Sequence, residues 1–213
     1  PYSVDNNRFG DAASNLAHHR SAMRQAIGMP DNAKVALFCG KFIYKKRPLD
    51  LLEAYNKIKN SNDYLLMIGE GELRAEMESF CKQNDLSNVI LTGFVNQSEI
   101  PKYYSIADFF VMCSGVGETW GLATNEAMNF GLPVLLSDMT GCRTDLLKEG
   151  QNGFGFKTGD IDHLAKLLSK MYRMDNSQLQ EMGKSSINLI KTYSNQTIIS
   201  NFIASQEEEP KHA

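Results

Sequence analysis

The chain has 213 residues and carries 22 lysines and arginines against 25 acidic residues, which gives a net charge of −3. Hydrophobic residues make up 42% of it, so the chain can bury a sizeable core and wholesale disorder is excluded. The near balance of charge excludes nucleic-acid binding by net charge alone. No apolar run approaches the ~20 residues that a membrane-spanning helix needs, and the start shows no signal-peptide pattern.

The cysteines are widely spaced, and no two of them form a CxxC pair. In a chain of this length they are interpreted as reduced core thiols and not as a disulfide framework or a zinc site. Reduced thiols without a signal peptide indicate a cytoplasmic protein. The residues concerned are Cys39, Cys81, Cys113 and Cys142.

Residues 1–13 contain a proline and turn-forming residues without periodicity, which predicts an interdomain linker. A helix is expected from about Ser14, with Gly28 and Pro30 ending it. Two amphipathic helices near 178–192 and 195–205 come late in the chain, and a disordered tail is predicted over 207–213. Between the first helix and these last ones, short apolar runs alternate with helix-length segments. The runs lie at 34–40, 63–69, 88–93, 108–114, 132–138 and 152–156.

These runs are apolar throughout and do not alternate with polar residues, as strands buried on both faces require. Strands separated by helices favour parallel pairing with right-handed crossovers. The sequence therefore predicts an α/β fold. It consists of a single doubly wound Rossmann-like domain over residues 14–206, with about six parallel strands, helices on both faces and extra C-terminal helices.

In such a sheet, ligands bind beyond the carboxyl ends of the strands, where the winding reverses. With the strand order 3-2-1-4-5-6, this point lies between the loops Gly40–Pro48 and Ser114–Gly121. The first loop has one glycine, so side chains and not bare backbone would meet an anion there. Its cationic residues are Lys41, Lys45, Lys46 and Arg47.

The second loop leads into a helix that is expected from about Thr119. Free amide groups at that helix start would favour a phosphate. Helical geometry would separate Glu118 and Glu126 by about 12 Å along the axis. That is too far for a hydrolytic carboxylate pair, which needs about 5–9.5 Å. The spacing suits a ligand with hydroxyl groups on both sides of a diphosphate, such as a sugar and a ribose.

Metal ligation has one candidate, the DxD sequence Asp160-Ile161-Asp162. Because it follows a glycine and opens a helix, Asp160 is predicted to be a helix cap and not a metal ligand. Cationic side chains at a diphosphate would also make a divalent ion unnecessary. The histidines His18 and His19 lie in the first helix and are expected to face solvent.

The segment 118–134, ETWGLATNEAMNFGLPV, resembles the E-G-F-G-L-x-x-x-E-A-M-x-x-G-x-P-V pattern of retaining glycosyltransferases of family 4, which have the two-domain GT-B fold. Upstream, Gly40–Pro48 is similar to the family's G-R-L-x-x-x-K-x-P. LLMIGEGEL, VILTGFV and EGQNGFGF also look like family segments, so the resemblance covers nearly the whole chain. Of the two domains of the family fold, the chain resembles only the C-terminal, donor-binding domain. Three positions depart from the patterns: Lys41, Thr119 and Cys142.

The resemblance implies that Lys41 and Lys46 hold the donor diphosphate. Glu118 would contact the transferred sugar and complete a catalytic set with these lysines, and Glu126 would contact the ribose. The indole of Trp120 either walls the sugar pocket or packs under the helix. The other donor-binding residues implied are Gly40, Val95, Thr119, Gly121 and Leu122, with the backbone near Trp120.

The implied activity is sugar transfer from a nucleoside diphosphate sugar, a UDP-sugar by default, to an acceptor sugar or glycolipid. Retention of configuration and a role in glycan, polysaccharide or glycolipid synthesis follow from the resemblance. The acceptor site would belong to a missing N-terminal domain, so the chain alone is expected to be inactive. No cofactor, nucleic acid or transmembrane segment is expected, and the full-length protein would be cytoplasmic or peripheral to the inner membrane. The alternatives are a non-catalytic nucleotide-binding or interaction module, and a sugar-nucleotide epimerase or phosphorylase of similar architecture.

Overall fold

The computed structural model describes residues 2–60 and 62–207. Its strands form one parallel sheet with the order β3-β2-β1-β4-β5-β6, as the sequence predicted. The central strand β1 is flanked by β2 and β4, so the winding reverses between β1 and β4. The strands are β1 (Lys34–Cys39), β2 (Asp63–Ile68), β3 (Val89–Leu91), β4 (Phe109–Met112), β5 (Val134–Ser137) and β6 (Gly153–Phe156).

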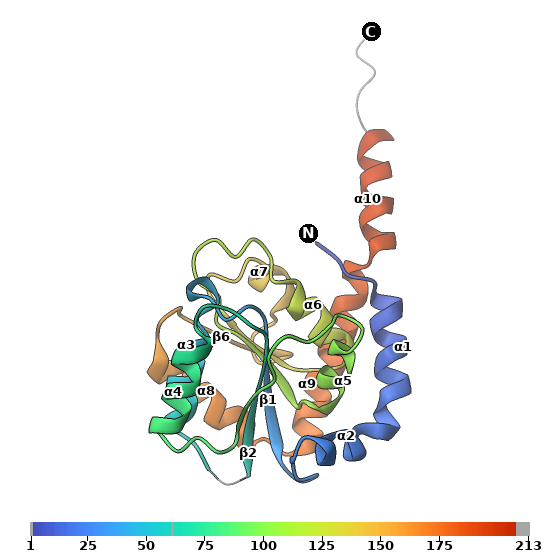
Figure 1. The fold of residues 1–213 in the computed structure, drawn as a ribbon. Coiled ribbons are helices and arrows are strands. Elements are labelled where there is room, and N and C mark those ends of the chain that lie inside the picture. Colours follow the sequence, from blue (N-terminus) through green and yellow to red (C-terminus); the bar gives the residue numbers. More distant parts are fainter. Residues whose placement is uncertain (1, 61, 208–213) are drawn as a thin grey trace.

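Helices cover both faces of this sheet (Figure 1). One face carries α3 (Pro48–Asn56), α4 (Arg74–Gln83) and α8 (Ile161–Arg173). The other carries α2 (Arg20–Ala26), α5 (Ile100–Ile106), α6 (Leu122–Asn129) and the short α7 (Arg143–Leu146). The remaining helices are α1 (Asn6–Leu16), α9 (Asn176–Ile190) and α10 (Asn195–Glu207), with 3-10 turns η1 (Ala17–His19), η2 (Tyr44–Lys46) and η3 (Lys191–Tyr193).

The strand β1 shows why the apolar runs do not alternate. Ala36 and Phe38 point into the core beneath α3 and α8, whereas Val35 and Leu37 point into the core beneath α5 and α6. All four side chains are at most 2% exposed. A strand with helices on both faces has no solvent side, so every position favours an apolar residue.

The first helix is the main difference from the sequence prediction. Residues 6–16 form α1, where a linker was predicted up to residue 13. The Asp5 carboxylate caps this helix by accepting a hydrogen bond from the Arg8 amide at 3.0 Å. Only Phe9 is buried among the residues of α1, where it packs edge-on against Phe130. A helix with a single buried side chain leaves no apolar periodicity in the sequence, which is why it was missed.

The first and last described segments lie on the side of the carboxyl edge of the sheet (Figure 1). In Figure 1 the first described residues approach this edge from one side, and α10 extends past it. Of the predicted tail, Glu207 ends α10 and residues 208–213 lie outside the described residues. Within the described ranges, no helix combines the length and hydropathy that a bilayer crossing requires.

The amino edge is held by a buried charge network between α2 and β4. Arg24 is 2% exposed, and its guanidinium donates to Asp108 at 2.9 Å and to the Ile106 carbonyl at 2.7 Å. Arg20 binds the other carboxylate oxygen of Asp108 at 2.7 Å. The Asp108 carboxylate also accepts from the amide of Val35 at 2.7 Å. One carboxylate therefore joins α2, β1 and β4.

Replacing Asp108 by alanine should destabilise the protein by about 3 kcal/mol or more, because the buried Arg24 guanidinium would lose its counter-charge. Urea unfolding followed by circular dichroism measures this loss. Glu181→Ala is the matched control, since it removes a carboxylate from the exposed pair with Lys184. We expect no measurable change there. Equal midpoints for the two variants would show that the Asp108 network does not hold the fold.

Candidate functional site

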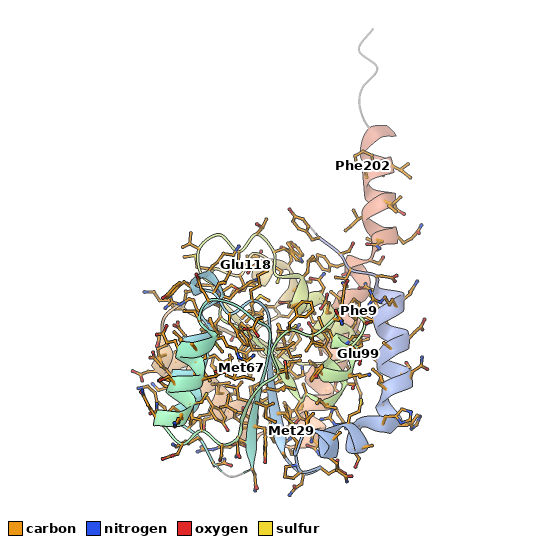
Figure 2. The ribbon with its side chains drawn as sticks, viewed as in Figure 1. Phe9, Met29, Met67, Glu99, Glu118 and Phe202 are labelled. Carbon is orange, nitrogen blue, oxygen red and sulfur yellow. The ribbon has the colours of Figure 1, made fainter. Side chains whose placement is uncertain are left out.

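The two loops predicted to flank the ligand crevice follow the carboxyl ends of β1 and β4. These strands are paired only through Ala36–Phe109 and Leu37–Phe110, whereas β1 follows β2 along its whole length. The loops after β1 and β4 therefore leave the centre of the sheet next to each other. Figure 2 shows Glu118 at this edge and Met29 at the opposite one.

Backbone and side-chain hydrogen bonds join the two loops. The amide of Gly115 donates to the carbonyl of Lys45 at 2.7 Å. In return, the ammonium of Lys45 donates to the carbonyl of Gly117 at 2.7 Å. Because the two bonds run in opposite directions between the same segments, they fix the loops relative to each other.

An ion pair between Lys46 and Glu118 lies beside this contact. Their side chains are only 19% and 9% exposed, so solvent screens the pair less than it would a surface pair. The Ser114 hydroxyl donates to the same carboxylate oxygen at 2.9 Å. Two residues that the sequence placed in one site thus meet in space. Ser114 was not singled out, although its position directly after an apolar strand was a signal.

The cations of the first loop have different partners. Arg47 binds Asp50 at 2.6 Å and adopts a left-handed backbone, with φ of 50°, just before Pro48. This geometry starts α3 and directs the guanidinium away from Glu118, to a carboxylate of its own. Lys45 is held by a carbonyl, and Lys46 by Glu118. Lys41 is exposed and has no ion pair among the described residues.

The helix α6 begins at Leu122 and not near Thr119 as predicted. Gly121 precedes it with φ of 98°, and a Cβ there would lie 2.6 Å from the Met112 sulfur. Glycine is thus needed both for the conformation and for the space. Glu118 lies in the loop, so the rise of an α-helix does not set its distance from Glu126. The helical rise on which the 12 Å estimate was based therefore does not apply to this pair.

The indole of Trp120 packs under α6. It is 8% exposed, and its ring lies 5.6 Å from the ring of Tyr2 and 6.3 Å from that of Tyr193. Its N–H donates to the Asn125 side chain at 2.8 Å. Of the two interpretations of this side chain, the structure supports packing. A donor contact through the backbone near Trp120 stays a prediction, as it does for exposed Thr119 and Leu122.

Glu126 projects from α6 towards α5. The hydroxyl of Tyr104 donates to its carboxylate at 2.8 Å. Burial raises the pKa of Glu126, while the Tyr104 hydrogen bond and the charge of Arg8 act in the opposite direction. Tyr104 is fully buried, and it was not singled out from the sequence, since a tyrosine on an amphipathic helix has no distinctive signal.

Glycines bring the ends of β1, β2 and β3 together. A Cβ on Gly69 would lie 1.9 Å from the carbonyl oxygen of Gly40, and the Gly69 amide donates to the Gly93 carbonyl at 3.2 Å. The side chain of Val95 packs against the core, whereas Phe94 is 76% exposed. Phe94 is therefore the residue of this stretch that offers a ring at the carboxyl edge.

The residues of the DxD sequence stabilise the start of α8 and an ion pair on its surface. Asp160 caps α8 by accepting from the His163 amide at 2.9 Å, as predicted, and Asp162 pairs with Lys57. Among the described residues, no three His, Cys, Asp or Glu side chains are grouped as metal ligands. His18 and His19 are exposed.

The cysteines are all free thiols, as predicted. Burial raises the pKa of the Cys39 thiol to about 12 and that of Cys81 to about 11. Burial also raises the pKa of Cys142 to about 12. A thiol with such a pKa is almost wholly protonated near neutral pH, so none of these three is an activated nucleophile.

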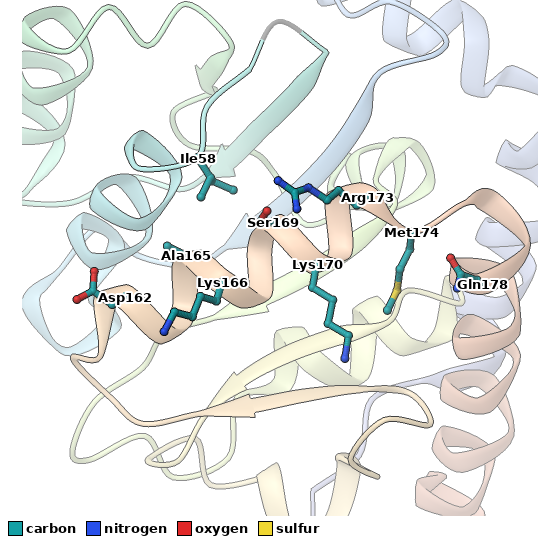
Figure 3. Close-up of a pocket in the computed structure, with 9 residues that line it drawn as sticks. All are labelled: Ile58, Asp162, Ala165, Lys166, Ser169, Lys170, Arg173, Met174 and Gln178. Carbon is teal, nitrogen blue, oxygen red and sulfur yellow. The ribbon is translucent and has the colours of Figure 1, made fainter.

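A cavity of about 840 Å³ lies away from this crevice, over α8. Figure 3 shows Lys166 and Lys170 on one side of the helix and Arg173 on the other. The Lys170 ammonium lies 3.7 Å from the centre of the Phe154 ring. The three cations do not converge on a point, and the lining includes none of the predicted site residues.

The family model for glycosyl transferases group 1 matches residues 19–188, so this chain belongs to that family. An uncharacterized glycosyltransferase of Methanocaldococcus jannaschii is 34% identical over 144 residues, which cover 67% of this chain and 36% of that protein. The chain thus spans little more than a third of that relative.

Solved structures show the same fold. The C-terminal domain of a group 1 glycosyl transferase from Francisella tularensis has a TM-score of 0.72 at 22% identity, covering 83% of this chain and 94% of that one. HepE of Anabaena, solved with UDP and glucose, has a TM-score of 0.77 at 20% identity over 98% of this chain and 55% of its own. The Francisella structure is itself a C-terminal domain, and its fold is the fold of this chain.

Gly141→Ala should move the loop that carries Glu118. A Cβ at this position would lie 2.1 Å from the Thr119 carbonyl oxygen and 2.9 Å from that of Glu118. We expect a loss of about 1–3 kcal/mol in unfolding free energy and faster hydrogen exchange over residues 114–121. Gly10→Ala is the control, because nothing lies within 4 Å of its Cβ. A helical glycine replaced by alanine should gain up to about 1 kcal/mol.

Proposed function

We propose that this chain is the donor-binding domain of a glycosyltransferase that moves a sugar from a nucleoside diphosphate sugar to an acceptor sugar or glycolipid. The meeting of Lys46 with Glu118 beside the start of α6 carries this proposal. A diphosphate placed there would meet an ammonium group and free helix-start amides. Its sugar would meet a carboxylate that accepts hydrogen bonds from hydroxyl groups. The UDP and glucose in the Anabaena structure support a UDP-sugar as the donor.

The proposed reaction breaks the bond between the anomeric carbon and the diphosphate oxygen. The diphosphate leaves with that electron pair, and Lys46, Lys41 and the α6 amides stabilise the charge that develops on it. An acceptor hydroxyl forms the new bond and loses its proton to the leaving phosphate. Attack from the face that the diphosphate leaves would retain the configuration, as the family resemblance implies.

The acceptor half of the reaction is assigned to a further domain that faces the carboxyl edge. The loops that follow the strands at this edge expose apolar side chains, which a second domain packed against the edge would bury. They are Tyr44, Phe94, Val116 and Met139. The share of its relative that this chain spans supports a second domain of this kind.

Cationic side chains would take the place of a divalent ion at the diphosphate. We therefore expect EDTA to leave nucleotide affinity unchanged. The free thiols, together with the proposed use of nucleotide sugars, support a cytoplasmic location. In the full-length protein this includes the inner face of the membrane.

Isothermal titration calorimetry of the chain with UDP, and in parallel with GDP and ADP, tests the proposal directly. Lys46→Ala should weaken UDP binding about tenfold or more, because a charge-assisted hydrogen bond to the diphosphate is lost. In a full-length enzyme the same change should lower kcat by about 10²–10³. Lys102→Ala is the control, since this lysine pairs with Glu99 on the surface of α5. Absence of binding for all three nucleotides would refute the proposal.

Glu118→Gln should strengthen the binding of UDP, a nucleotide without a sugar, whereas Lys46→Ala should weaken it. The carboxylate competes for Lys46 and repels the diphosphate, so its removal should tighten UDP binding roughly fivefold. Glu99→Gln, a change at an exposed carboxylate, should leave the affinity as it is. Weaker UDP binding in Glu118→Gln would mean that this carboxylate does not face the diphosphate.

A further inference from the structure

The hydroxyl of Tyr104 has one proton, and the structure shows where it goes. The acceptor at 2.8 Å is the Oε2 atom of Glu126, whereas the Ala123 carbonyl is 3.4 Å away. Tyr104 is fully buried, which raises its pKa well above the usual value and keeps the phenol protonated. It therefore acts on Glu126 as a constant hydrogen-bond donor.

Packing prevents the ring of Tyr104 from leaving this position. It stacks on Phe130 with 5.5 Å between ring centroids and 25° between planes, and Phe110 of β4 lies 6.3 Å away. Its neighbour Tyr103 lines a different groove, towards α2. A rigid aromatic ring on α5 thus sets the direction of a carboxylate on α6.

Glu126 itself is only partly buried. In the described part of the chain, its side-chain hydrogen bond uses Oε2, which leaves Oε1 to accept from elsewhere. The other groups that act on or near it are Arg8 of α1 and the Cys39 thiol at the end of β1. Of these, Tyr104 alone donates a hydrogen bond to the carboxylate.

We propose that Tyr104 is a positioning residue for donor binding, which holds one oxygen of Glu126 so that the other accepts hydrogen bonds from the ribose of a nucleoside diphosphate. This inference rests on the proposed function. It assigns a specificity role to a core tyrosine that touches no ligand. Loss of its hydroxyl would affect recognition of the ribose hydroxyls and leave binding of the diphosphate intact.

Calorimetry with two ligands, UDP and 2′,3′-dideoxy-UDP, separates these effects. The unaltered chain should bind UDP about tenfold more tightly than the dideoxy form. Tyr104→Phe should remove most of this preference by weakening UDP, with the dideoxy affinity unchanged. In a Glu126→Gln background, Tyr104→Phe should add little, because it acts through that carboxylate. Tyr103→Phe is the matched control and should keep the full preference.

Thermal unfolding of each variant checks that it is folded at the assay temperature. If Tyr104→Phe is not, Glu126→Asp replaces it, since the shorter side chain keeps the charge but draws the carboxylate away from the Tyr104 hydroxyl. It should lose the same preference for UDP. A variant that keeps the tenfold preference, or weakens both ligands equally, overturns the inference and leaves the proposed function standing. Lack of binding by the unaltered chain to UDP, GDP and ADP would overturn the proposed function, and this inference with it.

Discussion

The pairing of β1 with β4 is the constraint on which the carboxyl edge depends. It lies where the crossovers change from one face of the sheet to the other, so the loops after these strands begin side by side at the switch point, where such folds bind ligands. The Arg24–Asp108 network holds the amino ends of both strands. At the other end, the Gly115 amide and the Lys45 carbonyl join the loops directly. The two strands are therefore joined at their amino ends by the charge network and at their carboxyl ends by the contact between the loops.

The charges in this crevice are arranged before any ligand arrives. Lys46 and Glu118 neutralise each other in a poorly exposed place, where Coulomb interactions are stronger than at the surface. Glu126 has a different environment, in which burial raises its pKa and the Tyr104 hydroxyl stabilises the ionised form. One carboxylate is balanced by an ammonium group and the other by a neutral hydroxyl donor. These two environments suit a site that binds a charged group between two hydroxyl-bearing ones.

Elements with buried apolar runs were predictable because the period of the sequence reports directly on burial. All the strands followed from runs such as 34–40 and 108–114, and their observed order is the common one for a doubly wound sheet, which was the order assumed. The helix α1 was not predictable in this way, since Phe9 is its only buried residue. The start of α6 was misplaced because Gly121 has a left-handed backbone, and the contact that excludes a Cβ there, with the sulfur of Met112 in β4, exists only in the folded chain.

By itself, the sequence determined the doubly wound sheet, the two loops that meet at its switch point, and the cap formed by Asp160. These features depend on local pattern and on chirality, which a linear chain carries with it. The tertiary structure alone decided which of four neighbouring cations faces Glu118, and that Tyr104 reaches Glu126. Such contacts depend on the direction of side chains from different elements, to within an ångström. Packing sets that direction, and the spacing of residues along the chain does not predict it.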